Sequence, residues 1–304
     1  MKKIDVILTT YNSSKFILSV VNSIINQKGN GEVFNINLII VDDCSKDSTT
    51  DILLRNNILF FKTKQNTGGP NYGRNIALKK CNGDYICIAD HDDVWMPHKI
   101  LRLLDFIHLA PIITSGYFLL DHITGITTEI VNKKSKGREY AIYNTNETFL
   151  DKLSKRKGGQ LTYLGSIMFD SSLKKILFEE KYGMVDFDWI LKLFHNRNSV
   201  EIFEPLYHRN VESSNLSLNE KYRKNDYYLS LKVVKTYSNT YPKLVSKSVK
   251  RINGTLARFY YLIGNMSLSR KYFLKSSMNI KTILYLFTTF VGSNFVKKHF
   301  KIFG

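Results

Sequence analysis

A short apolar strand that leads directly into a cluster of acidic residues constrains this chain more than any other feature. Residues 83–95 read Gly-Asp-Tyr-Ile-Cys-Ile-Ala-Asp-His-Asp-Asp-Val-Trp. The apolar run is typical of a strand buried on both faces of a parallel sheet. The three carboxylates that follow, Asp90, Asp92 and Asp93, repel one another unless a cation lies among them, and Mg²⁺ and Mn²⁺ prefer carboxylate oxygens. The segment therefore indicates a site for a metal and a nucleotide, although acidic residues also form turns and cap helices.

Strand-like and helix-like segments alternate through the first hundred residues. Apolar runs at 3–8 and 36–41 predict buried strands, and residues 15–27 between them have apolar side chains at helical spacing. A short strand at 58–62 and a helix at 74–80 precede the acidic segment. This order predicts an α/β fold with a mostly parallel, doubly wound sheet. The polar strand ends would then meet at one edge of the sheet, where ligands bind in such folds.

Length and cysteine content narrow the class of protein further. The 304 residues are enough for one large domain, or for one domain with an extension. Cys44, Cys81 and Cys87 lack the paired spacing of a disulfide framework or a zinc site. The N-terminus lacks the apolar core of a signal peptide, so we expect a cytoplasmic protein.

Positive charge is concentrated toward the C-terminus. The net charge is +18, and residues 227–304 contain fourteen Lys or Arg and no Asp or Glu. Because these charges alternate with apolar runs such as residues 283–287, we expect an anionic membrane surface as the partner and no nucleic acid. Residues 280–296 are too short and too polar to span a bilayer, and fit an interfacial amphipathic helix better. A solvated basic face on packed helices, or a homo-oligomer, stays open as an alternative.

Four motifs follow one another in a fixed order along the chain. They are Thr9-Thr10-Tyr11-Asn12, then Val41-Asp42-Asp43-Cys44-Ser45-Lys46-Asp47-Ser48-Thr49, then Asn66, Gly68, Arg74 and Asn75, and finally the acidic segment, with Trp95, Pro97 and Lys99 after it. Together they resemble the inverting GT-A glycosyltransferases of family 2, over about residues 3–217. Thr9 stands where the family usually has proline.

The resemblance implies a GT-A fold, Rossmann-like with flanking helices, over residues 1–220. Its nucleotide-binding half would cover about 1–100 and its acceptor half about 101–220, with a basic helical region over 221–304. The implied activity is metal-dependent, inverting transfer of one hexose or N-acetylhexosamine from a nucleotide-sugar, a UDP-sugar by family frequency. The implied acceptor is an oligosaccharide or a lipid-linked glycan of O-antigen, lipooligosaccharide or capsule synthesis, at the inner face of the cytoplasmic membrane.

The resemblance also implies roles for individual residues. The residues that it implies bind the donor are Thr9, Thr10, Tyr11, Asn12, Asp43, Asn66, Arg74 and Asp90. Of these, Asp43 would accept from the uracil N–H, Arg74 would contact the diphosphate, and Asp90 would lie by the ribose. Asp92 would hold Mn²⁺ or Mg²⁺, with Asp90 and His208 as further candidate ligands. The adjacent Asp93 is expected to cap the next helix instead.

The expected general base is Asp186, with Asp188 as the second candidate. An inverting displacement needs one base at the acceptor hydroxyl. The family's glutamate aligns with Val185, so the usual Glu-Asp pair is incomplete here, and a helix N-cap is the competing explanation for these aspartates. In the closing segment Arg209 matches the family, whereas Val211 stands at a usual histidine position. No Gln-x-x-Arg-Trp signature of processive synthases occurs, which favours transfer of single sugars.

Two other classes of protein are weighed against this one. A non-catalytic nucleotide- or polyanion-binding protein with a degenerate GT-A fold is favoured by the missing glutamate and histidine, and opposed by the presence of Asp43, Asp90, Asp92 and Asp186. A dinucleotide oxidoreductase is disfavoured, because residues 68–73 do not form G-x-G-x-x-G after the first strand.

Overall fold

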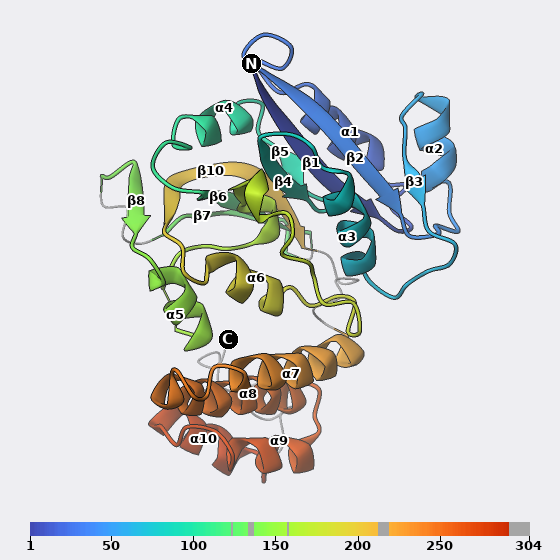
Figure 1. The fold of residues 1–304 in the computed structure, drawn as a ribbon. Helices are drawn as coiled ribbons and strands as arrows, with labels where there is room; N and C mark the ends of the chain where they lie inside the picture. Colours follow the sequence, from blue (N-terminus) through green and yellow to red (C-terminus); the bar gives the residue numbers. More distant parts are fainter. Residues whose placement is uncertain (123, 133–136, 157, 212–218, 292–304) are drawn as a thin grey trace. The chain divides into compact units, whose positions relative to one another are not determined.

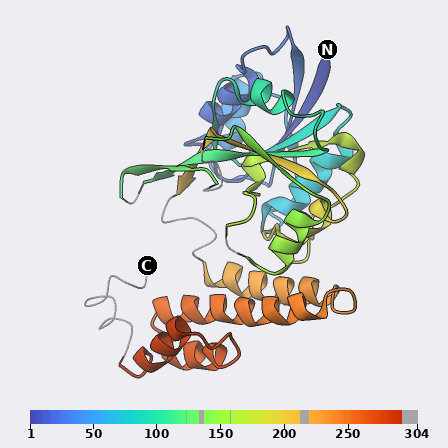
Figure 2. The ribbon, with the colours of Figure 1, turned by 90° about the vertical axis from the view of Figure 1, so that its left-hand side faces the viewer.

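The computed structural model describes residues 1–122, 124–132, 137–156, 158–211 and 219–291 (Figure 1). Contacts divide the chain into two compact units. The first comprises residues 1–149 and 158–215 and contains the sheet; the second comprises residues 150–157 and 216–304 and is helical (Figures 1 and 2). The expected division into donor and acceptor halves stays a prediction.

The first unit is built on one ten-stranded sheet of order β3-β2-β1-β4-β9-β6-β10-β5, with β7 beside β6 and β8 beside β10. Strands β3, β2, β1 and β4 are mutually parallel, as are β6 and β10, and antiparallel β9 joins the two groups. The strands are β1 Lys2–Thr10, β2 Phe34–Asp42, β3 Phe61–Lys62, β4 Tyr85–Ala89, β5 Val94–Trp95, β6 Ile112–Asp121, β7 Ile126–Ile130, β8 Tyr140–Tyr143, β9 Met168–Asp170 and β10 Ser199–Val211. The expected α/β class is confirmed.

Helices cover both faces of the parallel part of the sheet. The α-helices that alternate with the strands along the chain are α1 Ile17–Ile25, α2 Thr49–Arg55, α3 Pro70–Lys80, α4 Lys99–Leu104, α5 Glu147–Leu153, which ends in the second unit, and α6 Phe187–Phe194. Helix α1 buries Val20 and Ile24 in one core with Val6 and Leu8 of β1. Helix α3 lies on the opposite face, and a Cβ at Gly73 would come within 3.0 Å of the Thr9 methyl group, so this glycine permits the close approach.

The acidic loop is also a structural connection within the sheet. Residues 90–93 carry the chain from β4, in the middle of the sheet, to β5, which pairs antiparallel with β10 at the end of the strand order. Val94 lies opposite His208 in that pairing, and Trp95 opposite Tyr207. The loop therefore has both of its ends fixed by strands.

The described residues of the second unit comprise four helices after residue 219 and the segment that begins at residue 150. The helices are α7 Glu220–Lys235, α8 Pro242–Leu262, α9 Met266–Phe273 and α10 Ile280–Thr288. Ala257, Tyr261, Phe273 and Tyr285 form its small core. Arg251 of α8 donates to the carbonyl of Ser154 at 2.6 Å, which attaches the segment to the helices. Within the described residues, no helix combines the length and the apolar character needed to cross a bilayer. Residues 292–304, which include the end of the interfacial helix expected over 280–296 and the last basic residues, lie outside the described part of the chain.

Candidate active site

The loops after β1 and β2 are joined by hydrogen bonds into one edge of the sheet. Asn12, which has a positive φ of 49°, accepts from the Lys46 amide at 2.8 Å, and its own amide donates to Ser45 Oγ at 2.9 Å. Asparagine tolerates this left-handed conformation better than most residues. The amide of Ser14 donates to Asp47 at 3.0 Å. The expected donor-side residues Thr9, Thr10, Tyr11 and Asn12 therefore lie beside the aspartate motif.

The aspartates of this motif serve the loop as well as the site. Asp42 accepts from the amide of Ser45 at 2.9 Å and from its hydroxyl at 2.5 Å. Burial alone would raise the pKa of Asp47, but hydrogen bonds from Thr49 and Ser14 outweigh burial and lower this pKa to about 2. Asp42 and Asp47 thus stabilise the backbone conformation of the loop after β2.

Asp43, the expected partner of the nucleotide base, is buried and accepts from the loop that follows β3. Its carboxylate receives the Thr63 hydroxyl at 3.0 Å, and the amide and hydroxyl of Thr67 at about 3 Å. Asn66, also expected on the donor side, donates to the same carboxylate at 3.2 Å. A carboxylate offers about four acceptor directions, so a base N–H would have to share or replace one of these donors.

Arg74 of α3 lies against the acidic loop. Its Nη2 pairs with Asp90 Oδ1 at 2.7 Å, and its Nη1 donates to Asn71 Oδ1 at 3.1 Å. The Arg74 side chain is only 6% exposed, whereas Asp90 is 38% exposed. Asp90 thus has a buried cationic partner on one side and access to solvent on the other.

The start of α3 is bound to the segment before α6. Asn71 Nδ2 donates to the carbonyls of Glu179 and Val185, both at 2.9 Å. Asn75 donates to the Phe178 carbonyl at 3.0 Å and accepts from the Phe178 amide at 2.8 Å. These bonds hold the peptide directly before Asp186 against the helix that carries Arg74.

Asp186 and Asp188 lie in different surroundings at the start of α6. Asp186 occupies the N-cap position, but its side chain makes no capping hydrogen bond. Asp188, in the first turn, receives Lys192 Nζ at 2.6 Å and is 10% exposed. Val185, at the position of the family's glutamate, is 1% exposed and belongs to the packed interior. Of the two aspartates, Asp188 is the one bound to a lysine on its own helix.

Asp93 is the buried member of the acidic loop, and Asp92 is partly buried. Burial, and then the nearby Asp90, raise the pKa of Asp92. Burial and the charges of Asp90 and Asp92 hold the pKa of Asp93 well above its usual value. The expectation that Asp93 caps the next helix is wrong, because α4 begins only at Lys99 and its N-cap residue is His98.

A buried lysine lies beneath the acidic loop. The Lys99 ammonium lies 4.0 Å from the centre of the Trp95 ring and 4.6 Å from that of Tyr207, and it donates to the Gly165 carbonyl. Burial lowers the pKa of Lys99 to about 8, against the opposing effects of Cys87 and Asp93. A Cβ at Gly165 would come 2.7 Å from an Asp93 carboxylate oxygen, so Asp93 lies directly against this glycine.

The end of β10 brings Arg209 and Asn210 to the acidic loop, and His208 lies on the opposite face of the strand from Arg209. Arg209 lies over the Tyr163 ring at 4.7 Å, and Asn210 donates to the Asp92 carbonyl. Successive side chains of a strand point to opposite faces, and the His208 ring stacks on Phe118 at 5.1 Å. The structure therefore does not bring the candidate ligand His208 to the face of Tyr207 and Arg209.

Several buried polar atoms around the loop have no hydrogen-bond partner among the described residues. They are Thr10 Oγ1, Arg74 Nε, His91 Nδ1, Trp95 Nε1 and the Tyr207 hydroxyl. Unsatisfied buried groups are uncommon in native proteins and often mark the place of a water or ligand. In the described part of the chain no three His, Cys, Asp or Glu side chains surround one point as metal ligands.

Sequence reasoning did not assign roles to Asn71 and Gly165, and it treated Lys99 only as part of a motif. Their partners are far away along the chain: Val185 for Asn71, and Gly165 for Lys99. The signal available in the sequence for Lys99 was its place beside apolar helix residues, shortly after three carboxylates.

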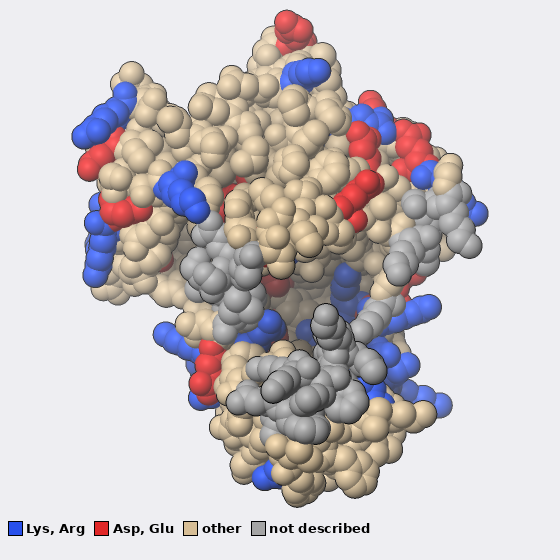
Figure 3. Space-filling model, turned by 180° about the vertical axis from the view of Figure 1, so that it is seen from behind, with Lys and Arg blue, Asp and Glu red and all other residues tan. Residues whose placement is uncertain are grey.

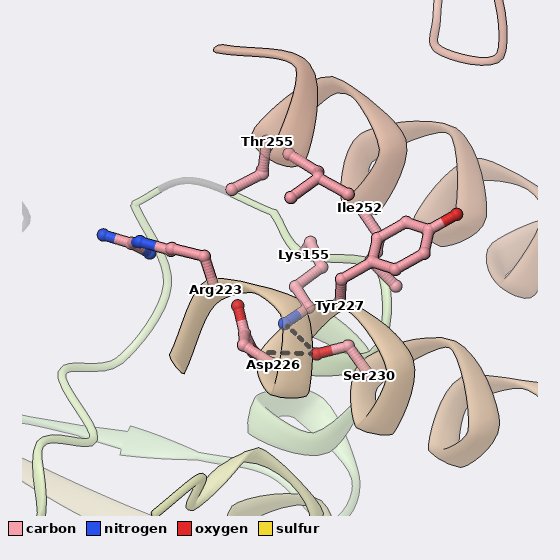
Figure 4. A pocket seen from close by; sticks show the side chains of 8 residues that line it. Lys155, Arg223, Asp226, Tyr227, Ser230, Ile252 and Thr255 are labelled. Carbon is pink, nitrogen blue, oxygen red and sulfur yellow. Dashed lines mark hydrogen bonds between the residues drawn. The ribbon is translucent and has the colours of Figure 1, made fainter. Parts of the chain in front are cut away.

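A separate pocket occurs in the helical unit (Figure 4). Lys155 Nζ lies 3.4 Å from Ser230 Oγ, and Ser230 donates to Asp226 at 3.0 Å. In Figure 4 the Arg223 side chain points away from these three residues. The hydrogen bonds among Lys155, Ser230 and Asp226 attach segment 150–157 to α7.

Comparison with known proteins identifies the family. The sequence model described as "Glycosyl transferase family 2" matches residues 5–160, about half of the chain, including the edge formed by β1, β2 and the acidic loop. The chain belongs to glycosyl transferase family 2. The expected family and its GT-A fold are thus confirmed.

Individual members of family 2 give further similarities. The chain is 40% identical over 97 residues to the poly(ribitol-phosphate) β-N-acetylglucosaminyltransferase TarS of Staphylococcus aureus, covering 31% of this chain and 17% of TarS. It is 32% identical over 118 residues to the Escherichia coli UDP-Glc:α-D-GlcNAc-diphosphoundecaprenol β-1,3-glucosyltransferase WfaP, covering 38% and 45%. These matches span less than half the length of either relative.

Solved structures of other glycosyltransferases show the same fold. The structure of TarS residues 1–349 with UDP-GlcNAc superimposes with a TM-score of 0.60 at 18% identity, covering 94% of this chain and 90% of that one. The mannosyltransferase PcManGT of Pyrobaculum calidifontis, solved with GDP-Man and Mn²⁺, gives 0.57 at 12% identity, covering 99% and 81%.

Proposed function

We propose that this family 2 protein transfers a single hexose or N-acetylhexosamine from a UDP-sugar to a glycan acceptor with inversion at the anomeric carbon. The observation that carries the proposal is the connection of the Arg74–Asp90 pair, through Asn71, to the peptide preceding Asp186. It gives the donor-side carboxylate and the candidate base a common support. UDP-GlcNAc in TarS and UDP-Glc in the name of WfaP support UDP as the nucleotide.

Binding of the donor is assigned to the edge formed by β1, β2 and α3. Thr9, Thr10, Tyr11 and Asn12 would line the nucleotide, and Asp43 with Asn66 would face the base. Thr10 Oγ1 and Arg74 Nε, both buried and unpaired among the described residues, would gain partners from a polar ligand. Asp90 would contact the ribose while Arg74 holds its other side.

The residues of the acidic loop fit a divalent cation. Asp92 is an oxygen ligand whose pKa burial and Asp90 raise, so a cation would relieve the cost of charging it. Asp92, with Asp90 as a second ligand, would hold Mn²⁺ or Mg²⁺, and the remaining ligands would come from the diphosphate and water. When bound, the ion would supply Lewis-acid stabilisation of the leaving diphosphate. PcManGT, solved with Mn²⁺, is consistent with this assignment.

Asp186 is proposed as the general base. It would take the proton of the acceptor hydroxyl as that oxygen attacks the anomeric carbon. Asp188, the second candidate, pairs with Lys192 of its own helix at 2.6 Å. The hydrogen bond from the Asn71 side chain to the Val185 carbonyl would hold Asp186 in position relative to Arg74 and Asp90.

The acceptor is proposed to be a lipid-linked glycan used in surface-polysaccharide synthesis, as in the name of WfaP. The protein would then act as a peripheral protein at the cytoplasmic face of an anionic membrane. The excess of Lys and Arg after residue 226 supports this location.

The proposal is tested by calorimetric titration with UDP, GDP and dTDP, with Mn²⁺ and then with EDTA, on the wild type and on Asp92→Ala. We expect metal-dependent binding of UDP that Asp92→Ala weakens strongly. Asp186→Asn should keep UDP binding and lose sugar transfer, while the matched Asp188→Asn keeps most of both. Absence of binding to all three nucleotides would favour the non-catalytic alternative, and retained transfer in Asp186→Asn would remove Asp186 as the base.

A further inference from the structure

Helix α10 exposes apolar side chains and buries polar ones. Ile280, Ile283, Leu284 and Phe287 are 79%, 38%, 48% and 68% exposed, and Phe290 and Val291 directly after the helix are 73% and 62% exposed. Thr282 and Thr289, in contrast, are buried. The six exposed apolar residues recur at intervals of three and four, so they lie along one side of the helix. We call them the α10 stripe.

Specific contacts fix this orientation of α10. Tyr285, on the buried side, packs edge-on against Tyr261 at 5.0 Å and stacks with Phe273 at 5.4 Å between ring centres. The Tyr261 hydroxyl donates to Thr288 Oγ1 at 2.9 Å, and Arg270 donates to the Thr289 carbonyl at 3.0 Å. Turning the helix to hide the stripe would break all four contacts. The exposure is therefore a stable property of the helical unit.

The surroundings of the stripe are cationic. Lys271 and Lys275 at the end of α9 and Lys281 in α10 are exposed, and residues 227–291 contain no Asp or Glu. Figure 3 shows one face of the molecule, on which Lys and Arg are prominent over the helical unit and Asp and Glu are few. A partner for this surface must therefore be apolar where it meets the stripe and negatively charged around it.

We propose that the α10 stripe inserts into the interfacial region of an anionic lipid bilayer, with Lys275 and Lys281 at the headgroups. A second copy of the chain is disfavoured as occupant, because it would bring the same positive charge to the contact. An anionic bilayer offers both required properties: acyl chains for the apolar side chains and charged headgroups for the lysines. The inference deepens the membrane partner of the proposed function by naming the inserting surface, and it does not depend on catalysis.

The test uses the full chain and vesicles of phosphatidylcholine with or without phosphatidylglycerol. Leu284→Gln/Phe287→Gln removes apolar surface without changing charge, and Lys275→Gln/Lys281→Gln removes charge without changing the stripe. Leu54→Gln/Leu59→Gln is the matched control, because these leucines are 63% and 90% exposed in the sheet unit. Co-sedimentation gives the partition coefficient, and UDP titration of every variant reports separately on the donor site.

We expect the wild type and the Leu54/Leu59 control to bind anionic vesicles equally. The Leu284/Phe287 variant should lose roughly tenfold or more in partition, because both substitutions remove apolar surface that the bilayer would bury. The Lys275/Lys281 variant should bind anionic vesicles less tightly and lose the preference for them. UDP binding should be unchanged throughout. Equal vesicle binding by wild type and the Leu284/Phe287 variant would overturn the inference, as would a wild-type dimer that this variant converts to monomer without any vesicle binding.

Discussion

Asn71 donates its side-chain amide to the main-chain carbonyl of Val185 at 2.9 Å, directly ahead of Asp186. The same side chain accepts from Arg74, which pairs with Asp90. One fully buried amide thus connects the two ends of the candidate site. Asn71 therefore links the position of the proposed base Asp186 to that of Asp90.

Replacement of Asn71 by alanine is therefore expected to lower the turnover of sugar transfer more than it weakens UDP binding. Loss of two buried donors and one acceptor should also reduce the free energy of unfolding by about 2–4 kcal/mol. Steady-state kinetics, UDP calorimetry and urea unfolding measure the three effects. Asn56→Ala, whose side chain bonds only within its own helix end, is the control. Unchanged turnover in Asn71→Ala would show that the anchor does not position Asp186.

Gly165→Ala tests the packing beneath the acidic loop. A Cβ there would lie 2.7 Å from an Asp93 oxygen and 2.9 Å from the Tyr207 ring, closer than real Cβ atoms come. Since Tyr207 is fully buried in β10 and Asp93 is only 2% exposed, the acidic loop must move. We expect metal-dependent UDP binding to weaken and the melting temperature to fall by several degrees, as for overpacking that costs about 1–3 kcal/mol. Wild-type behaviour in both measurements would mean that the loop is not held against Gly165.

Lys99 should make stability rise with pH in the alkaline range. In the folded state the pKa of Lys99 is about 8, below the ordinary lysine pKa of 10.5 that applies in the unfolded state. The folded protein therefore loses this proton at lower pH than the unfolded chain does. Burying the charge opposes folding below pH 8, and this cost disappears as pH rises from 8 to 10.5. The unfolding free energy of the wild type relative to Lys99→Met should therefore increase over that window, by on the order of 3 kcal/mol. Groups shared by both proteins cancel in the difference. A flat difference would show that Lys99 titrates normally.

Asp47 should have the opposite dependence, in the acidic range. Its folded pKa of about 2 lies below the usual 3.8, because hydrogen bonds from Thr49 and Ser14 favour the carboxylate despite burial. Its contribution to stability is present above about pH 4 and is lost as pH falls toward 2. The isosteric variant Asp47→Asn should accordingly be less stable than wild type at pH 7, with a difference that narrows between pH 4 and pH 2. Urea unfolding at these pH values measures it, and a constant difference would contradict the assignment.

Local composition predicted some elements of the fold well and others poorly. Strand β4 occupies residues 85–89 as expected, because an apolar run flanked by turn residues is a strong local signal. Helix α3 begins at Pro70 instead of Arg74, since proline is favoured in the first turn of a helix. The strand expected at 58–62 is reduced to two residues, Phe61 and Lys62, at the edge of the sheet beside β2.

The sequence supplied candidate residues for the site but not their contacts. The sequence motifs pointed to Asp43, Arg74, Asp90 and Asp186, but not to the saturation of Asp43 by Thr63, Asn66 and Thr67. His208 illustrates the reason. It was a candidate ligand because Val211 stands at the family's usual histidine position, and its ring stacks on Phe118 of the neighbouring strand β6. Such partners are set by strand pairing between distant segments, which local patterns do not encode.

The acidic loop, fixed at one end by β4 and at the other by the pairing of β5 with β10, has a mechanical consequence. The loop works as a short strap across the sheet, so the strands on either side of it cannot separate without pulling on the carboxylates. The strands on the two sides of the loop belong to one continuous hydrogen-bonded sheet, so we expect them to move as one body rather than as two lobes that swing on a hinge. Opening and closing around substrates must then come from side chains and surface loops, and a nucleotide bound at the strap should slow amide exchange as far away as β10.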